Sequence, residues 1–210
     1  MSGLIVASYV SVSFIIAQWF SAPPYNYTPA NVGYLEAGPA IASLVGSLII
    51  PAISDPVVKF CVKRNKGIYE PEFRLYPMVI CLLFTVPGLV LYGIGLQQYW
   101  NPVYTSVVLG VLKFGVLIGF IASSSYILDG FRNLSSEVFV TSMAVKNFLF
   151  YGLSYFVNHW IMEGGPVQMF GVFAGISGFV ILLGVPVYIW GKRYRSFWAR
   201  RSRREARSHA

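Results

Sequence analysis

The chain has 210 residues, of which 56% are hydrophobic and only 11% are charged. Soluble domains carry about 25% charged residues, and a mean hydropathy of +0.61 is too high for a fold that covers its core with polar surface. The composition therefore excludes a water-soluble domain and predicts an all-α, polytopic membrane protein.

Six apolar stretches are long enough to cross a bilayer, since a spanning helix needs about 20 mainly apolar residues to cross about 30 Å of hydrocarbon. We expect a six-helix bundle in residues 1–190 and a basic tail in 191–210. In chain order, the expected spans are 3–20, 34–53, 75–96, 103–128, 137–157 and 169–190. A polar loop, 54–74, follows the second span, and a turn from Gly164 to Pro166 separates the last two.

Basic residues mark alternate loops. The net charge is +8, and all sixteen Lys and Arg fall in 54–74, in 129–136 or beyond 190, except Lys113 and Lys146. Because an excess of Lys and Arg marks cytosolic loops, the sequence predicts that both termini are cytosolic. A basic run directly after a span is better read as an anchor on anionic lipid heads than as a nucleic-acid site. The bilayer, and not nucleic acid, is the expected partner.

Small residues recur at four-residue spacing in three spans. On one helix face, such residues let neighbouring backbones approach closely. We expect ordinary helix packing there; the alternative is that these faces slide during transport. The sets are Gly38, Ala42 and Gly46; Gly115 and Gly119; and Gly171 and Gly175.

The polar loop after the second span carries a motif. Ser54-Asp55 ends the span, and the run from Asn65 to Leu75 reads Asn-x-Gly-x-x-x-Pro-Glu-x-Arg-Leu. Further matching positions are Pro24-Tyr25, Lys63-Arg64, Tyr126, Asp129, Lys146-Asn147 and Lys192-Arg193. Together they resemble helices seven to twelve of fungal major facilitator superfamily transporters of the drug:proton antiporter type. Pro56 departs from the pattern, because the family usually has a basic residue there.

The resemblance implies transport by alternating access, in which two six-helix bundles rock around a site at the bilayer midplane. The family's usual work is proton-coupled export of drug-like small molecules, and we expect the plasma membrane as the location. This chain would be one half of the transporter, with a second six-helix half supplied by a separate N-terminal half or by a homodimer. The alternative is a truncated, non-transporting fragment or an interaction subunit that needs such a half.

The resemblance also places a cytosolic gate at the inner ends of the second and fourth spans. It implies that Asp55 pairs with a basic neighbour in one state and releases it in another; the basic neighbours are Lys59, Lys63 and Arg64. Asp129 ends the fourth span, where the helix dipole disfavours a carboxylate, so we expect a partner, with Arg132 as the candidate. The alternatives are a solvated loop that only fixes topology and a structural ion pair at Asp129.

Two lysines fall in the middle of spans. Lys113 and Lys146 each lie about ten residues, or roughly 15 Å, inside a helix. A charge at that depth costs about 2.5–3.5 kcal/mol, so both should face a water-filled cavity, and with Asn147 they are the candidate substrate pathway. The alternative is a lysine packed between helices. Every carboxylate is expected near an interface, including Glu36, which is a candidate for a proton path.

Enzyme chemistry finds no support in the sequence. His159 and His209 are the only histidines, and no Ser/His/Asp set, metal-ligand spacing or phosphate-binding loop is present. We therefore expect a protein that is not an enzyme and needs neither cofactor nor metal. Its expected partners besides lipid are a small-molecule substrate and protons.

Overall fold

The computed structural model describes residues 2–130, 135–186 and 188. The prediction of an all-α protein is confirmed: the described residues form helices and no strand. The helices are α1 (Ser2–Ser21), α2 (Pro29–Leu35), α3 (Ala37–Arg64), the short 3-10 helix η1 (Pro71–Leu75), α4 (Met78–Gln97), α5 (Pro102–Gly130) and α6 (Ser135–Leu182). The expected basic tail lies outside the described residues.

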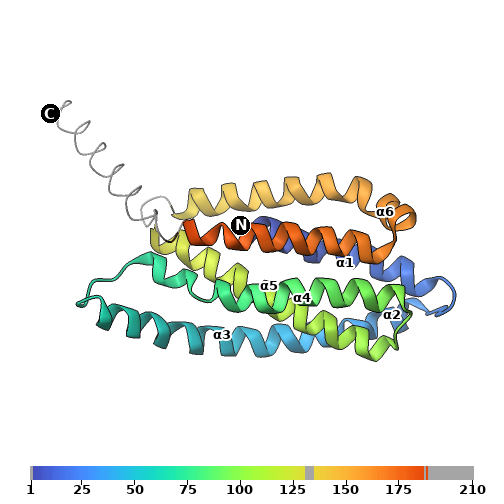
Figure 1. Cartoon of the computed structure of the whole chain (residues 1–210), viewed down its shortest axis with the longest axis horizontal. Coiled ribbons are helices and arrows are strands. Elements are labelled where there is room, and N and C mark those ends of the chain that lie inside the picture. Colours follow the sequence, from blue (N-terminus) through green and yellow to red (C-terminus); the bar gives the residue numbers. More distant parts are fainter. Residues whose placement is uncertain (1, 131–134, 187, 189–210) are drawn as a thin grey trace.

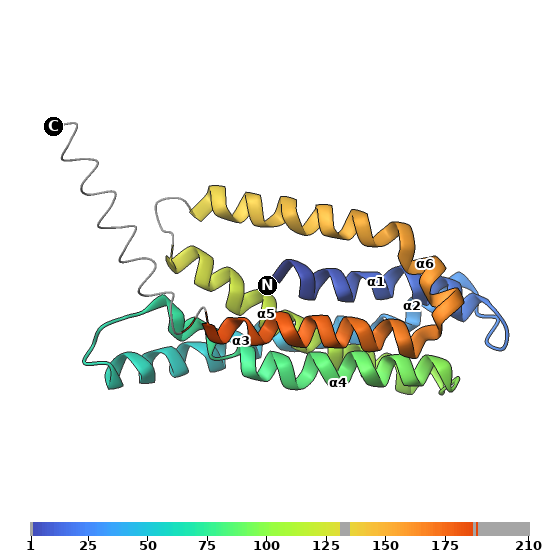
Figure 2. The same ribbon diagram turned by 45° about the horizontal axis from the view of Figure 1, so that its top comes forward.

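The long helices lie side by side in one bundle with two distinct ends (Figures 1 and 2). We call one the basic end; it holds the loop 65–70 and the last turn of α5. The other is the aromatic end, formed by the loops 22–28 and 98–101. There the Tyr25 hydroxyl donates to the Trp100 carbonyl at 2.6 Å, and the Tyr25 ring packs on Phe20 with ring centroids 4.7 Å apart. Aromatic rings of this kind favour a headgroup zone.

The second predicted span is built from two helices. α2 ends at Leu35, and Glu36 is the joint at which α3 begins. Ser106 of α5 secures the joint: its hydroxyl donates to the Leu35 carbonyl at 2.8 Å and accepts from the Gly38 amide at 3.2 Å. The Leu35 carbonyl and the Gly38 amide, which a break in the helix leaves without their usual partners, are thereby hydrogen-bonded.

The prediction of a loop over 54–74 is wrong for its first half, because α3 remains helical to Arg64. Two prolines, Pro51 and Pro56, lie inside the helix and are exposed. Apolar side chains continue past them, and Val58 is buried against the bundle. Tertiary packing on this side of α3 therefore outweighs the local tendency of proline to end a helix.

α6 consists of two arms joined by a sharp turn. Gly165 is the one non-helical residue between them, with φ 75° and ψ 164°, and the chain reverses there (Figure 2). The first arm packs on α1, where Phe14 and Phe150 stack with ring centroids 5.2 Å apart. The second arm packs on α4, where the Tyr92 and Phe170 rings meet edge to face.

Gly165→Ala is expected to destabilise this turn. A φ of 75° with an extended ψ is a region that only glycine occupies readily, so a methyl group there costs about 1–3 kcal/mol. The matched control is Gly152→Ala in the first arm, where an added Cβ meets nothing within 4 Å. Thermal unfolding in detergent should show a clear fall in Tm for the first variant and none for the second. Equal Tm values for both would contradict the turn geometry.

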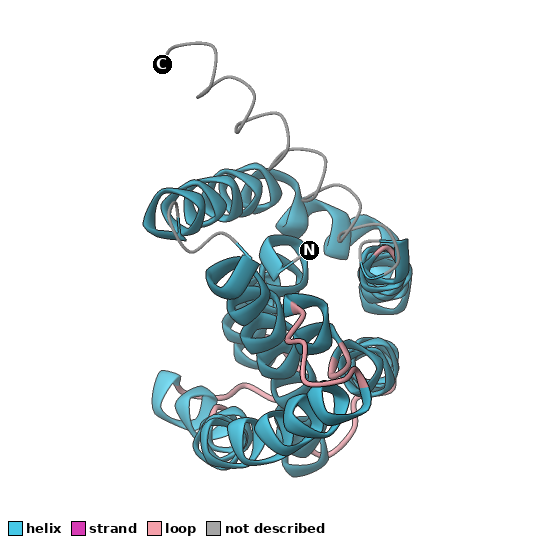
Figure 3. Ribbon diagram, turned by 90° about the vertical axis from the view of Figure 1, so that its left-hand side faces the viewer, coloured by secondary structure: helices cyan, strands magenta, loops and turns pink. Residues whose placement is uncertain are grey.

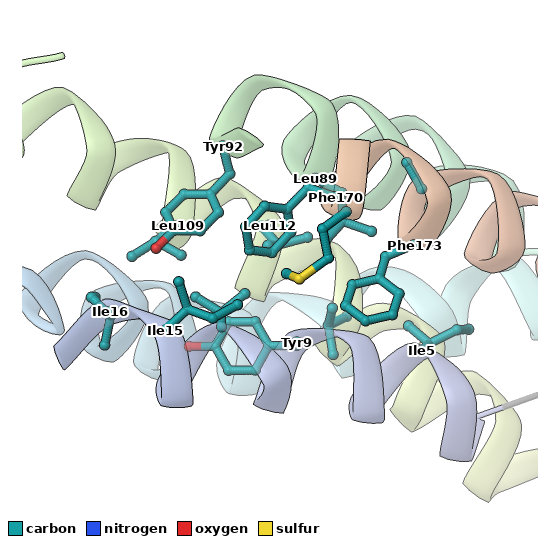
Figure 4. Packing of buried hydrophobic residues seen from close by; sticks show 14 of the residues in the cluster. Ile5, Tyr9, Ile15, Ile16, Leu89, Tyr92, Leu109, Leu112, Phe170 and Phe173 are labelled. Carbon is teal, nitrogen blue, oxygen red and sulfur yellow. The ribbon is translucent and has the colours of Figure 1, made fainter. Parts of the chain in front are cut away.

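The core lies among α1, α4, α5 and the second arm of α6. Leu89, Leu109, Leu112 and Phe170 are fully buried there, and Figure 4 shows them packed above α1. α3 and the first arm of α6 lie at the edges of the bundle, which Figure 3 shows end-on. Their outward side chains are apolar and exposed, which is the surface that lipid tails cover in a membrane protein.

Five helical stretches among the described residues are long and apolar enough to cross a membrane. They are Gly3–Ser21, Pro29–Arg64, Pro71–Gln97, Pro102–Gly130 and His159–Pro186. The predicted span 137–157 is not among them. It forms most of the first arm of α6, and Glu137, Lys146 and Asn147 lower its hydropathy.

The small-residue faces divide into two kinds. At Gly115 an added Cβ would lie 2.7 Å from Thr85, and at Gly119 it would lie 2.7 Å from the Cys81 sulfur, so both pack tightly on α4. At Gly171 and Gly175 nothing lies within 4 Å. The packing expectation is therefore wrong for the last pair within this chain, because the face that carries them points out of the bundle.

Candidate functional site

A polar hollow of about 440 Å³ opens between α1, the α2–α3 joint, α5 and the first arm of α6. Such a volume is within the usual range of small-molecule sites, about 300–1,000 Å³. Its polar side chains are Tyr9, Ser13, Glu36, Lys113 and Lys146, and its apolar ones are Val6, Val10, Val116, Leu117 and Phe120. The structure thus brings both mid-span lysines to one hollow.

Lys113 approaches the hollow from α5. It lies eleven residues after Pro102, the first residue of the helix, or about 16 Å along the axis. Its ammonium nitrogen lies 4.1 Å from the centre of the Tyr9 ring. A cation over a ring face is stabilised by about 0.5–2 kcal/mol, more where water is scarce. Tyr9 is itself buried, so it holds Lys113 in a defined position.

Lys146 approaches from the first arm of α6, where the arm crosses the start of α1. Gly3 makes room for it: a Cβ added at Gly3 would lie 3.4 Å from the Lys146 Cβ. Lys146 is half-buried, whereas the neighbouring Asn147 is exposed and does not line the hollow. The two adjacent candidates therefore lie on different faces of the helix.

Glu36 lines the same hollow as Lys113 and Lys146. Its neighbours Leu35 and Gly38 contact Ser106, four residues after the start of α5, so Glu36 lies closer to the aromatic end than Lys113 does. The break between α2 and α3 makes Glu36 a corner residue rather than one position on a continuous helix. Gly38-Pro39 was the local signal for the break, because proline has no amide hydrogen to donate to the Leu35 carbonyl four residues earlier.

A larger hollow of about 660 Å³ lies between α1 and the two arms of α6. Glu137, Thr141 and Ser142 line it together with apolar side chains. The Thr141 hydroxyl donates to the Glu137 backbone carbonyl at 2.8 Å, as hydroxyls in helices commonly do. Neither mid-span lysine lines this hollow, so it is the weaker candidate for a site.

An ionic cluster connects three elements at the basic end. Arg74 of η1 contacts two carboxylates: its Nη1 lies 2.9 Å from Asp55 Oδ1 of α3, and its Nε lies 3.1 Å from Asp129 Oδ2 of α5. The Tyr69 hydroxyl also donates to Asp129. The guanidinium of Arg74, a residue of η1, therefore links α3 to α5.

The cluster corrects the expected pairings. Among the described residues, neither Asp55 nor Asp129 forms an ion pair with a cation other than Arg74. Lys59, Lys63 and Arg64 are exposed instead, and Arg132 lies outside the described residues. Arg74 was overlooked because it lies 19 residues from Asp55 and 55 from Asp129. Its place in the Pro-Glu-x-Arg-Leu run was the available signal.

The same cluster affects the protonation of Tyr69. Burial, and then its hydrogen bond to the Asp129 carboxylate, raise the pKa of the Tyr69 hydroxyl. The hydroxyl therefore keeps its proton at neutral pH and stays a donor. Asp129 consequently receives one charged and one neutral donor, which is a stable arrangement for a carboxylate that is only 27% exposed.

Arg74→Gln should lower the free energy of unfolding by about 1–3 kcal/mol, because Asp129 loses its cation while remaining half-buried. The Asp55 side of the cluster contributes little, since that carboxylate is 56% exposed and solvent screens the pair. Lys59→Gln also removes one positive charge, but at an exposed position. Its free energy of unfolding should stay within about 0.5 kcal/mol of that of the unsubstituted chain. Denaturant titration in detergent compares the two; similar losses would contradict the role of the cluster.

Comparison with known proteins relates the chain to fungal transporters. It is 26% identical to protein HOL1 of Saccharomyces cerevisiae over 179 residues, which is 85% of this chain and 30% of that protein. It is 28% identical to the MFS-type transporter penM of Penicillium rubens, over 82% of this chain and 34% of the relative. The multidrug transporter DTR1 of Candida glabrata is 29% identical over 55% of this chain and 21% of DTR1.

No family model and no solved structure matches the chain. The chain spans about a third of the length of the curated relatives HOL1 and penM, at 30% and 34%. The apolar helices of the chain and its similarity to these relatives lead to the same conclusion. The chain is a multi-pass membrane protein that resembles a part of the fungal major facilitator superfamily transporters.

Proposed function

We propose that the chain forms one wall of a pathway that moves small molecules across a membrane by alternating access. The observation that carries this proposal is the polar hollow, which Lys113, Lys146 and Glu36 line between α1, α5 and the first arm of α6. Charged side chains at membrane depth are costly and are found chiefly on substrate and ion pathways. Asn147, on the other face of α6, is a candidate for contact with a second half.

The ionic cluster at the basic end is the proposed gate. Its members belong to α3, η1 and α5, so breaking the Arg74 contacts would remove a polar link between these elements at the basic end. A cluster with exposure of 27% at Arg74 and 56% at Asp55 is held by a few kcal/mol at most, which suits a contact that must open and close. In this proposal Lys59, Lys63 and Arg64 act as the surrounding basic surface on the cytosolic side.

We further propose proton-coupled export of drug-like molecules from a plasma membrane, with both termini cytosolic. The multidrug transporter DTR1 supports the substrate class, and Glu36 is the proposed proton carrier because it is the carboxylate of the hollow. The remaining wall would come from a second six-helix half, either a separate N-terminal half or a second copy. The chain's share of about 30% of HOL1 supports this requirement.

Reconstitution in proteoliposomes tests the proposal. The 210-residue chain is assayed for uptake of a fluorescent drug-like amphiphile under an imposed pH gradient, alone and together with a separately expressed six-helix N-terminal half. The proposal predicts uptake only with both halves present, or from the chain alone if it forms a homodimer. No uptake in either arrangement, with both halves folded and inserted, would instead identify a non-transporting fragment or an interaction subunit.

A further inference from the structure

The polar hollow has an excess of positive charge. Two ammonium groups, Lys113 and Lys146, and one carboxylate, Glu36, line it, so its wall has a net charge of +1 when all three are ionised. In the described part of the chain, no carboxylate oxygen lies within 4.0 Å of either ammonium. Ammonium groups at membrane depth without a carboxylate in direct contact are unfavourable. A ligand that supplies negative charge would offset this cost.

The rest of the hollow favours an apolar ligand body. Its apolar lining is formed by Val6, Val10, Val116, Leu117 and Phe120. Lys113 is already oriented by the Tyr9 ring, 4.1 Å from its ammonium nitrogen. A group that is held in position before binding loses less conformational entropy when the ligand arrives.

We propose that this hollow binds organic anions, specifically a carboxylate attached to an apolar body, with Lys113 and Lys146 contacting the carboxylate. The inference deepens the proposed function and rests on it for the role of the hollow as a pathway. Glu36 repels the same carboxylate and so directs it towards the lysines. Substitutions at the three positions should therefore change affinity in opposite directions.

Three fluorescent probes with one ring system separate charge from apolar contact: 1-pyrenebutyrate, 1-pyrenebutanol and 1-pyrenemethylammonium. Each is titrated against the full 210-residue chain in phosphatidylcholine nanodiscs, with empty nanodiscs as background. The butyrate should bind at least about tenfold more tightly than the other two, since hydrogen bonds to charged groups contribute more than neutral contacts. Raising the salt concentration should weaken binding of the butyrate and leave the butanol unchanged.

Lys113→Met and Lys146→Met should each weaken butyrate binding about tenfold without affecting the butanol. Glu36→Gln should tighten it. The matched control is Lys66→Asn, which removes one exposed positive charge far along the chain from the hollow; Asn tolerates the positive φ of 56° at that position. The control should bind all three probes as the unsubstituted chain does.

Several outcomes would overturn the inference: equal affinities for the three probes, no salt effect on the butyrate, or unchanged butyrate affinity in both lysine variants. Native mass spectrometry with phosphatidylglycerol provides a further outcome that would overturn it. If the lysine variants lose this lipid but keep the probe, the ligand is a lipid headgroup. Selective butyrate binding by a chain that does not transport would contradict the proposed function alone, so the two failures are distinguishable.

Discussion

Gly38→Val is expected to disrupt the bundle more than Gly165→Ala or Arg74→Gln. A Cβ at Gly38 would lie 2.1 Å from the backbone oxygen of Ser106, and backbone cannot move aside as a flexible side chain can. The substitution would also separate the Ser106 hydroxyl from the Gly38 amide and the Leu35 carbonyl. Overpacking costs about 1–3 kcal/mol, and the lost hydrogen bonds add about 1 kcal/mol each.

The readout is thermal unfolding together with the yield of monodisperse protein in detergent. Gly33→Ala is the matched control, because Gly33 lies on the neighbouring α2 and an added Cβ there meets nothing within 4 Å. The control should keep the Tm and the yield of the unsubstituted chain, while Gly38→Val should lose most of its folded material. A Gly38→Val variant as stable as the control would show that α3 and α5 do not cross so closely.

Lys146→Met is the second change with a large expected effect, this time on transport. In proteoliposomes that contain both halves, it should reduce the initial uptake rate at least about tenfold, since a charged hydrogen bond to substrate contributes about 1.5–3 kcal/mol. The Tm should change little, because methionine keeps the length of the apolar stem that packs near Gly3.

The control for the transport assay is again Lys66→Asn, which removes the same charge from an exposed loop position. Its uptake rate should match that of the unsubstituted protein. Unchanged uptake by Lys146→Met would remove this residue from the mechanism. A matching loss in the control would show that overall charge, and not the hollow, limits the rate.

The course of the helices was largely predictable because long apolar stretches in a membrane protein have few alternatives. The turn at Gly165 was predictable for the same reason, since Gly164 to Pro166 interrupts an apolar region. The break at Glu36 was only partly predictable. Pro39, which has no amide hydrogen for the Leu35 carbonyl, was a local signal, but the Ser106 hydroxyl that donates to this carbonyl instead lies 71 residues from Leu35 in the sequence.

The sequence predicted how far inside the helices the two site lysines lie, but not which way their side chains point. Counting residues placed Lys113 and Lys146 mid-span, yet only the packing of α1 between α5 and the first arm of α6 brings them to one hollow. Asn147 shows the limit of sequence adjacency, because one step along a helix turns a side chain by about 100°. Arg74 shows another limit: partners chosen for nearness in sequence were not the partners in space.

Water access to the hollow tests the central claim most directly. Leu117→Cys, in the hollow, is compared with Leu48→Cys, which is 75% exposed on the outward face of α3. Both are made in a Cys61→Ser background, with the fully buried Cys81 retained. In liposomes, a charged, water-soluble thiol reagent should label the first variant and leave the second unlabelled, because lipid covers it. Equal labelling, or labelling of Leu48→Cys alone, would contradict a water-filled pathway lined by Lys113, Lys146 and Glu36.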